Sequence, residues 1–584
     1  MYWFRLDYWN PQSNPGLLIF ILSTISIKYI TNPLIFLPAL SPKSANIAQK
    51  KLLSAKALYI LPMAKTTNNK KQKSIEETLW ESANKLRGTV ESSEYKHVVL
   101  GLIFLKFTSD KFEQRRQELV SEGKEKYVEM KEFYNMKNIF YLAPESRWSY
   151  IMDNAKQDDI ALKIDTALHT IEKNNPALKG ALPDNYFSRL NMEVSKLAAL
   201  LDTINNINTL KDKENDIVGR VYEYFLSKFA LAEGKGKGEF YTPKSIVNLI
   251  AEMIEPYKGI IYDPACGSGG MFVQSVKFIE AHHGSKKEIS IYGQEQTATT
   301  YKLAKMNLAI RGISANLGDV PADTFARDQH PDLKADFIMA NPPFNQKGWR
   351  TADELTTDPR WNGYDVPPAS NANYGWILNM VSKLSANGVA GFILANGALS
   401  GSGTEYNIRR KLIENKLVEA ILILPQNMFY TTNISVTLWI LNNNKTERTL
   451  VLPDTTRHYR NREEEILFMD LREIGEPFEK KFTQFSPEHI RQIAKTYHDW
   501  QQKDSGYQNI PEYCYSATLE EVRAKDYSLV PSKYIAFVNR DENIDFDEKM
   551  ETLRDEFTQL LQEEEQSKRE LLKVFKELGY EINL

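Results

Sequence analysis

A glycine-rich turn between an apolar run and a helix start is the feature that most limits the fold of this sequence. Residues 260–262 read Ile-Ile-Tyr, Asp263 ends this β-prone run, and residues 267–270 read Gly-Ser-Gly-Gly before an apolar helix start. Glycines let the backbone pass close to a ligand, as in one half of a βαβ unit. The spacing fits neither the dinucleotide fingerprint nor the phosphate loop. The turn alone leaves a purely structural role open.

Two acidic residues further along favour a nucleoside-containing cofactor. Residues 289–295 form the next predicted strand, with Glu295 at its C-terminal end. An acid at this place can accept hydrogen bonds from both hydroxyls of a ribose. Asp319 stands where the following strand is predicted to end, within reach of the adenine of the same cofactor.

The tetrapeptide Asn341-Pro342-Pro343-Phe344 follows the apolar stretch 337–340. An exocyclic amine is a poor nucleophile because its lone pair is delocalised into the ring. The Asn341 side-chain oxygen and the Pro342 carbonyl are two acceptors that can localise this lone pair. Both prolines stiffen the turn, and Phe344 offers a ring on which a flipped-out base can stack.

The tetrapeptide and the glycine turn together predict an enzyme that moves a methyl group from S-adenosylmethionine to an amino nitrogen. The exocyclic nitrogen of adenine in DNA is the foremost candidate. A Pro-Pro turn that merely ends a buried strand is the structural alternative.

Strand and helix patterns alternate around these motifs, which predicts a doubly wound α/β sheet. Residues 391–395 and 418–424 are further predicted strands. Residues 436–441 follow without room for a crossover helix, so we expect this strand to pair antiparallel. The polar insertion 345–372 is rich in Pro, Trp and Asp, and its place after the tetrapeptide predicts a lid that faces the target base or DNA.

Helical patterns flank this central part. A capping box at residues 74–77 opens a helical stretch that continues to about residue 230, with a heavily apolar helix at 95–107. Near the other end, apolar residues recur every seven positions from Met550 to Leu578, interrupted at Glu564 and Ser567. This pattern predicts a helix with a coiled-coil-like face, which docks either within the chain or on the helices of a partner.

The first 62 residues differ from the rest. The uncharged run 16–27 ends at Lys28 after about a dozen residues, whereas a membrane span needs roughly 20. A polar, basic segment typical of a chain start begins at Met63. We interpret residues 1–62 as an artefactual upstream extension; a membrane-associating segment and a genuine irregular extension are the alternatives.

Charge and cysteine content limit the function further. The formal net charge of −3 is not the basic surplus that tight DNA binding usually requires, so site-specific binding is expected to need a partner. The 2 cysteines, far apart in sequence, fit neither a disulfide framework nor a zinc site, and they favour a cytoplasmic location. No metal is expected.

Motifs in one fixed order resemble the modification (DNA methyltransferase, M) subunit of a type I restriction–modification system. In chain order they are residues 238–244, 263–270 with Glu295, 341–344, 424–429 and 434–437. In the family these correspond to the segment over the methionine end of the cofactor, the cofactor loop with its ribose acid, the catalytic tetrapeptide and the closing strands. The resemblance covers residues from about Ser74 to about Tyr534.

The resemblance implies an α/β class I S-adenosylmethionine-dependent methyltransferase with a doubly wound sheet, an all-helical N-terminal domain and a helical C-terminal arm. The implied boundaries are 63–214 for the helical domain, 215–535 for the N6-adenine methyltransferase domain and 536–584 for the coiled-coil-like arm. The expected catalytic residues are Asn341, Pro342, Pro343 and Phe344. The expected cofactor-binding residues are Glu239, Phe240, Tyr241, Thr242, Pro243, Lys244, Asp263, Ser268, Gly269, Gly270, Glu295 and Asp319.

The implied function is site-specific methylation of a flipped-out adenine at N6. The implied partners are double-stranded DNA, a specificity (S) subunit and a restriction (R) subunit, with two M subunits for each S subunit and no membrane. A protein-glutamine or RNA N-methyltransferase is the alternative, since Asn-Pro-Pro-aromatic also occurs there. A non-catalytic assembly scaffold is a second alternative.

Overall fold

The computed structural model describes most of the chain from Ile75 onward. The described residues are 75–84, 92–207, 221, 223–225, 228, 242–429, 433–453, 455–478, 481–538 and 546–577. The predicted extension 1–62 and Ser74, the predicted N-cap, lie outside them. None of the described helices has both the length and the apolar character that crossing a bilayer requires.

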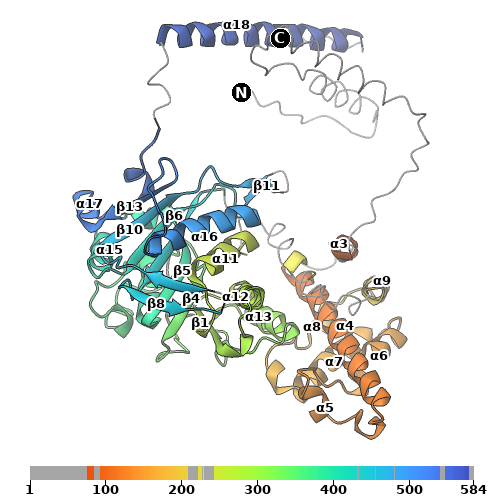
Figure 1. Ribbon diagram of the computed structural model, residues 1–584. Coiled ribbons are helices and arrows are strands. Elements are labelled where there is room, and N and C mark those ends of the chain that lie inside the picture. The colour runs from red at the N-terminus through yellow and green to blue at the C-terminus, as the bar shows by residue number, and fades with distance from the viewer. Residues whose placement is uncertain are drawn as a thin grey trace, which may run out of the picture. The chain divides into compact units, whose positions relative to one another are not determined.

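A nine-stranded sheet in the order β13-β10-β6-β7-β5-β4-β1-β2-β3 is built from strands between residues 259 and 518 (Figure 1). Its strands are β1 (Gly259–Asp263), β2 (Ile289–Gly293), β3 (Ala315–Asn316), β4 (Ala335–Ala340), β5 (Leu384–Ala395), β6 (Val418–Ile423), β7 (Val436–Asn442), β10 (Glu465–Asp470) and β13 (Cys514–Thr518). β1 to β5 pair in parallel, and β7 runs antiparallel between β5 and β6, as predicted. The strand order reverses between β1 and β4, and such a switch point is where α/β sheets bind ligands.

Helices cover both faces of the sheet because its central strands are apolar on both sides. They are α11 (Lys244–Ile254), α12 (Gly270–Ala281), α13 (Ala298–Ile310), α14 (Asn373–Lys383), α15 (Thr404–Glu414), α16 (Pro487–Gln501) and α17 (Leu519–Ala524). Ile338 on β4 belongs to one buried cluster and its neighbour Met339 to the other, as strand alternation requires. The doubly wound arrangement is therefore confirmed.

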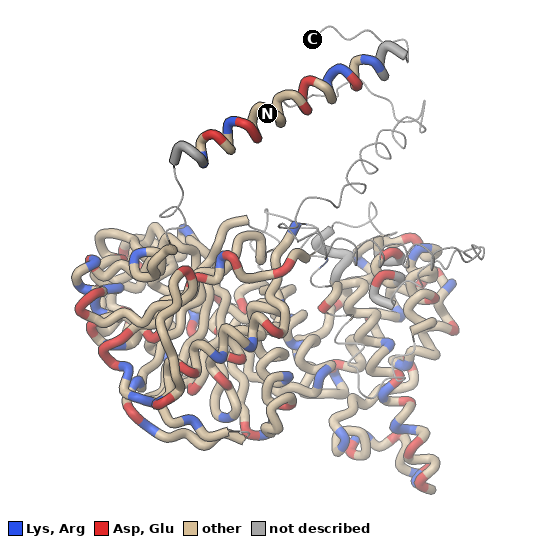
Figure 2. The backbone as a smooth tube through the Cα atoms, turned by 45° about the horizontal axis from the view of Figure 1, so that its top comes forward, with Lys and Arg blue, Asp and Glu red and all other residues tan. Residues whose placement is uncertain are grey.

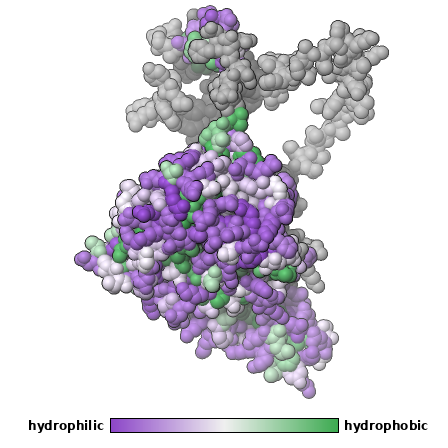
Figure 3. Space-filling model, turned by 60° about the vertical axis from the view of Figure 1, so that its left-hand side comes forward, coloured by the Kyte–Doolittle hydropathy of each residue, from purple (hydrophilic) through white to green (hydrophobic). Residues whose placement is uncertain are grey.

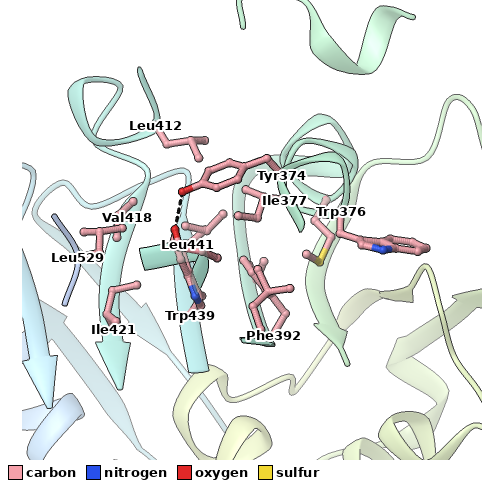
Figure 4. Packing of buried hydrophobic residues seen from close by; sticks show 14 of the residues in the cluster. Tyr374, Trp376, Ile377, Phe392, Leu412, Val418, Ile421, Trp439, Leu441 and Leu529 are labelled. Carbon is pink, nitrogen blue, oxygen red and sulfur yellow. Dashed lines mark hydrogen bonds between the residues drawn. The ribbon is translucent and has the colours of Figure 1, made fainter. Parts of the chain in front are cut away.

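Aromatic side chains fill the cluster between the sheet and α14. Phe392 and Trp439, on the paired strands β5 and β7, stack with their ring centroids 6.1 Å apart. Tyr374 and Ile377 of α14 point toward them from above (Figure 4), and the Tyr374 hydroxyl donates to the Ala398 carbonyl at 2.7 Å. This packing fixes α14 against the sheet.

In residues 75–84 and 92–207, before the sheet, the described secondary structure consists of helices joined by turns and loops, as predicted. Its helices are α3 (Ile75–Asn84), α4 (Ser92–Ser121), α5 (Glu132–Asn135), α6 (Trp148–Asp153), α7 (Ile160–Asn174), α8 (Tyr186–Arg189) and α9 (Val194–Asn205). The stretch predicted at 95–107 lies in the first half of α4, where residues 97–106 are buried.

Two small hairpins and a long helix follow β7. The hairpins pair β8 (Arg448–Val451) with β9 (Thr456–Tyr459) and β11 (Glu476–Phe478) with β12 (Phe482–Gln484). The helix is α18 (Phe546–Glu577), whose 32 residues confirm the predicted helical arm. Its apolar seam is exposed, with Phe557 62% and Leu560 61% accessible.

Candidate active site

Three of the predicted motifs meet at one edge of the sheet. Asp263 at the end of β1 is paired with Gly293 at the end of β2, and Ile261 and Tyr262 of β1 are paired with β4, which ends at Ala340. The glycine turn therefore follows β1, Glu295 follows β2, and the tetrapeptide follows β4, all at the carboxyl edge beside the switch point.

The glycine turn is held by backbone hydrogen bonds and open on its outer side. Cys266 N–H donates to the Gln294 carbonyl at 3.0 Å, which joins the turn to β2. Gly267 and Gly269 adopt positive φ values of 53° and 79°. A Cβ atom at Gly269 would meet Leu308 at 3.4 Å, whereas one at Gly267 or Gly270 would meet nothing within 4 Å. The backbone is therefore accessible to a ligand.

Glu295 links the turn to the segment after β2. Its Oε2 accepts from Gly267 N–H at 3.1 Å and its Oε1 from Thr297 N–H at 2.7 Å. β2 ends at Gly293, two residues earlier than the prediction, so Glu295 lies just beyond the strand. The carboxylate thus holds the turn in place, a role that the sequence did not reveal.

Asp263 is a buried acid whose charge is unfavourable in the protein alone. Asp263 is only 1% exposed, and its Oδ1 accepts a hydrogen bond from Ala265 N–H at 2.9 Å. Burial raises the pKa of Asp263 to about 8; the hydrogen bond from Ala265 lowers it, and the charge of Glu295 raises it further. A cationic ligand beside Asp263 would favour the ionised carboxylate.

Asn341 presents a buried acceptor that has no partner among the described residues. The residue is 8% exposed, and its Nδ2 donates to Thr242 Oγ1 at 2.9 Å. Within the described part of the chain, its Oδ1 is buried and accepts no hydrogen bond. Leaving such an atom unsatisfied costs about 1–3 kcal/mol, so a ligand that donates to it is favoured.

Thr242 therefore has a role that sequence reasoning missed. The sequence placed it among the cofactor-binding residues, but the structure shows its hydroxyl orienting the Asn341 amide. Because the two residues are 99 positions apart, no local pattern signals the contact. A second missed residue is Asn396, directly after β5, whose buried Oδ1 also lacks a partner among the described residues.

The rest of the tetrapeptide forms a stiff, partly open surface. Pro342 is buried, and Pro343 and Phe344 are half-buried. The Phe344 ring meets Phe429 edge to face, with centroids 5.9 Å apart and an interplanar angle of 81°. Phe429 ends the segment 424–429, which brings this motif to the site.

The remaining predicted residues lie around this edge or outside the described part. Ser268 accepts from Asn307 Nδ2 at 2.7 Å through its carbonyl. Asp319 lies in an exposed turn three residues after β3, so its contact with a cofactor remains a prediction. Pro243 is buried and Lys244 exposed where α11 begins. Glu239, Phe240 and Tyr241 lie outside the described residues.

The insertion 345–372 is anchored on the core. Trp349 and Trp361 are buried, and the nearly buried Arg360 donates to the Thr324 and Phe325 carbonyls at 2.8 and 2.7 Å. Its tryptophans therefore fix the segment in place. That its exposed residues face the target base or DNA remains a prediction.

A cavity of about 580 Å³ lies at the opposite edge of the sheet. Phe337 near the start of β4 and Val389 of β5 line it together with Arg448, Leu450 and Tyr459 of the β8–β9 hairpin. None of the candidate site residues lines this cavity, so it is separate from the site.

Comparison with known proteins identifies the family. Residues 213–543 match the model of the N-6 DNA Methylase family, and residues 75–207 match the HsdM N-terminal domain. The chain is 42% identical over 441 residues to the type I restriction enzyme HindI methylase subunit of Haemophilus influenzae, covering 73% of this chain and 94% of the relative. It is 34% identical over 527 residues to the MjaIX methylase subunit of Methanocaldococcus jannaschii, covering 86% and 91%.

Solved structures agree with the fold. The type I restriction-modification system methyltransferase subunit from Streptococcus thermophilus has a TM-score of 0.65 and 22% identity, covering 79% of this chain and 99% of that one. A chain from a study of complex assembly in the type I R-M system has a TM-score of 0.53 and 19% identity, covering 87% and 98%. The class I methyltransferase fold is thereby confirmed, and the protein-glutamine and RNA alternative is not favoured. The chain belongs to the N-6 DNA methylase family, among the methylase subunits of type I restriction enzymes.

Proposed function

We propose that the chain is the subunit of a type I restriction–modification complex that methylates adenine N6 in DNA with S-adenosylmethionine. The observation that carries this proposal is the buried Oδ1 of Asn341, which has no hydrogen-bond partner among the described residues and lies at the carboxyl edge of the sheet, in the same tetrapeptide as Phe344. An adenine in a duplex must flip out to reach such a buried acceptor.

The chemistry follows from two acceptors and one amine. One N–H of the adenine amine donates to Asn341 Oδ1 and the other to the Pro342 carbonyl, which draws the nitrogen toward tetrahedral geometry and localises its lone pair. When bound, S-adenosylmethionine supplies a methyl group on a sulfonium sulfur. The new N–C bond forms as the C–S bond breaks, and the amine then loses a proton to water. No side chain with a shifted pKa is required for that proton.

The residues at the edge fit this cofactor. The open backbone at Gly267 and Gly270 leaves room for a ligand, and the buried Asp263 carboxyl favours a cationic group. We assign the methionine end to Asp263 and the turn 268–270, with segment 239–244 over it. We assign the ribose to Glu295 and the adenine to Asp319.

Cofactor binding is expected to strengthen as pH rises toward 8. The pKa of Asp263 is raised to about 8, mainly by burial, so the free protein holds this carboxyl neutral at lower pH. If the cationic end of the cofactor requires the carboxylate, each pH unit below 8 weakens binding about tenfold. Calorimetry between pH 6 and 7 measures this slope while the amino group of the ligand stays mostly protonated.

Asp263→Asn is the matched variant for this slope. It removes the titrating group, so its weaker affinity is expected to change little with pH. Equal pH dependence in the two proteins, or a flat profile in the unchanged protein, would contradict the assignment of Asp263 to the cationic end.

We further propose that DNA recognition depends on a specificity subunit, with a restriction subunit completing the complex in the cytoplasm and two of these chains present per specificity subunit. The chain has a net charge of −3, and basic and acidic residues are intermixed over the described part of the chain (Figure 2). The face in Figure 3 is mostly hydrophilic, with apolar residues in small areas. The exposed seam of α18, by contrast, presents Met550, Leu553, Phe557, Leu560 and Leu571 for another helix.

Charges placed on this seam are expected to break the complex. The double substitution Leu553→Glu and Phe557→Glu replaces two exposed apolar side chains of α18 and should weaken binding to the purified specificity subunit at least about tenfold, which sedimentation measures. Gln559→Glu with Gln566→Glu changes charge on another face of the helix and should assemble normally. S-adenosylmethionine should bind both variants alike. Normal assembly of the seam variant would contradict the proposal.

A further inference from the structure

Three asparagine side chains form a hydrogen-bonded cluster at the residue that follows Phe344 in the sequence. Asn345 adopts a left-handed φ of 50°, and its N–H donates to Asn373 Oδ1 at 2.9 Å. In return, Asn373 Nδ2 donates to Asn345 Oδ1 at 2.9 Å, and Asn371 Nδ2 reaches the same oxygen at 3.3 Å. We call Asn345, Asn371 and Asn373 the amide clamp.

A second pair of hydrogen bonds extends the amide clamp by one residue. The Gln346 carbonyl accepts from Ala372 N–H at 3.0 Å, and Gln346 Oε1 accepts from Trp376 Nε1 at 3.2 Å. The two ends of the insertion are therefore fastened to each other. The insertion therefore starts and ends at the same place, beside the first turn of α14.

The amide clamp ties the tetrapeptide to a helix that cannot move easily. Asn373 is the first residue of α14 and is only 1% exposed. Tyr374, Ile377 and Leu378 of the same helix are fully buried against the sheet. The outgoing end of the tetrapeptide is thus fixed to the core, whereas its incoming end is fixed by β4.

We propose that Asn345 and Asn373 are positioning residues for methyl transfer, because their reciprocal pair sets where Phe344 holds the base against the Asn341 oxygen. This inference rests on the proposed function. The two prolines restrict the backbone before Phe344, and the amide clamp restricts it immediately after. A displacement of about 1 Å in such a site lowers the rate as much as a hundredfold.

Three variants separate the components of the pair. Asn373→Ala removes both hydrogen bonds of the pair, the one that Asn373 Oδ1 accepts from Asn345 N–H and the one that Asn373 Nδ2 donates to Asn345 Oδ1. Asn345→Gly keeps the positive φ but removes the acceptor, and Asn345→Asp keeps both. A role limited to folding predicts changes in stability with an unchanged catalytic rate.

The test is single-turnover methylation of target DNA by the complex with the specificity subunit. Asn373→Ala and Asn345→Gly are expected to lower the rate of the bound complex about 10- to 100-fold, with S-adenosylmethionine affinity within about twofold. Asn345→Asp should restore most of the rate lost in Asn345→Gly. The double variant of Asn345→Gly and Asn373→Ala should be no slower than Asn373→Ala alone, because Asn373→Ala already removes both hydrogen bonds of the pair.

Asn407→Ala is the control, since it removes a hydrogen bond of 2.9 Å from Nδ2 to Asp365 in the middle of the same insertion. It should methylate at the unchanged rate. If the unaltered protein methylates adenine and the variants Asn345→Gly and Asn345→Asp have the same rate as each other, the positioning role of Asn345 is overturned. The proposed function would stand in that case. An unaltered protein that forms the complex but methylates no adenine would overturn the proposed function, and the inference with it.

Discussion

Asn341→Ala is expected to lower the rate of methyl transfer at least about a hundredfold while S-adenosylmethionine binds almost as before. The substitution removes the buried Oδ1 that has no partner among the described residues. Loss of one preorganised hydrogen-bonding group at a reacting centre costs roughly 3–4 kcal/mol, or 10²–10³ in rate. Single-turnover assays with labelled cofactor and target DNA measure the rate, and calorimetry measures the affinity.

Asn341→Asp is the companion variant, because it keeps an oxygen where the acceptor stands. Its carboxylate loses the donation from Nδ2 to Thr242 Oγ1, which in the unaltered protein spans 2.9 Å. We expect it to retain more activity than Asn341→Ala. Near-normal turnover of Asn341→Ala would remove the catalytic assignment.

Glu295→Ala should weaken S-adenosylmethionine binding by a factor of ten or more. Two losses contribute: the proposed charge-assisted hydrogen bonds to the ribose, worth about 1.5–3 kcal/mol, and the hold of the carboxylate on Gly267 N–H and Thr297 N–H. Glu295→Gln keeps one oxygen acceptor and should lose less affinity. Isothermal calorimetry gives both values.

Glu288→Ala is the matched control for Glu295→Ala, since Glu288 is an exposed acid just before the same strand. Its affinity for S-adenosylmethionine should equal that of the unaltered protein. An unchanged affinity of Glu295→Ala would place the ribose elsewhere.

The parts of the fold that could be predicted are those set by local patterns. The strand, glycine turn and helix around Asp263 occupy one short stretch, and β1 and α12 appear where periodicity and glycine placement indicated. The antiparallel β7 also followed from local spacing, because no crossover helix fits before residue 436. Residues at the carboxyl ends of parallel strands converge once the sheet forms. The glycine turn, Glu295 and the tetrapeptide each follow a predicted strand, so the sequence could assign them to one site.

The parts that could not be predicted depend on contacts between distant residues. Thr242 meets Asn341 across 99 positions, and Asn373 meets Asn345 across 28. The insertion was predicted to be a DNA-facing lid from its place after the tetrapeptide, which stays a prediction, and nothing in the sequence indicated that Trp349 and Trp361 are buried in the core. Amide pairs and buried aromatic rings leave no periodic signal, so only the folded chain brings them together.

The most direct measurement of the central claim is the identity of the methylated product. The complex with the specificity subunit is incubated with S-adenosylmethionine that carries a deuterated methyl group and with target DNA, and the nucleosides are then analysed by mass spectrometry. We predict label in N6-methyldeoxyadenosine with the unaltered protein and at least about a hundredfold less with Asn341→Ala. Label on cytosine, RNA or protein, or equal labelling of adenine by Asn341→Ala, would contradict the claim.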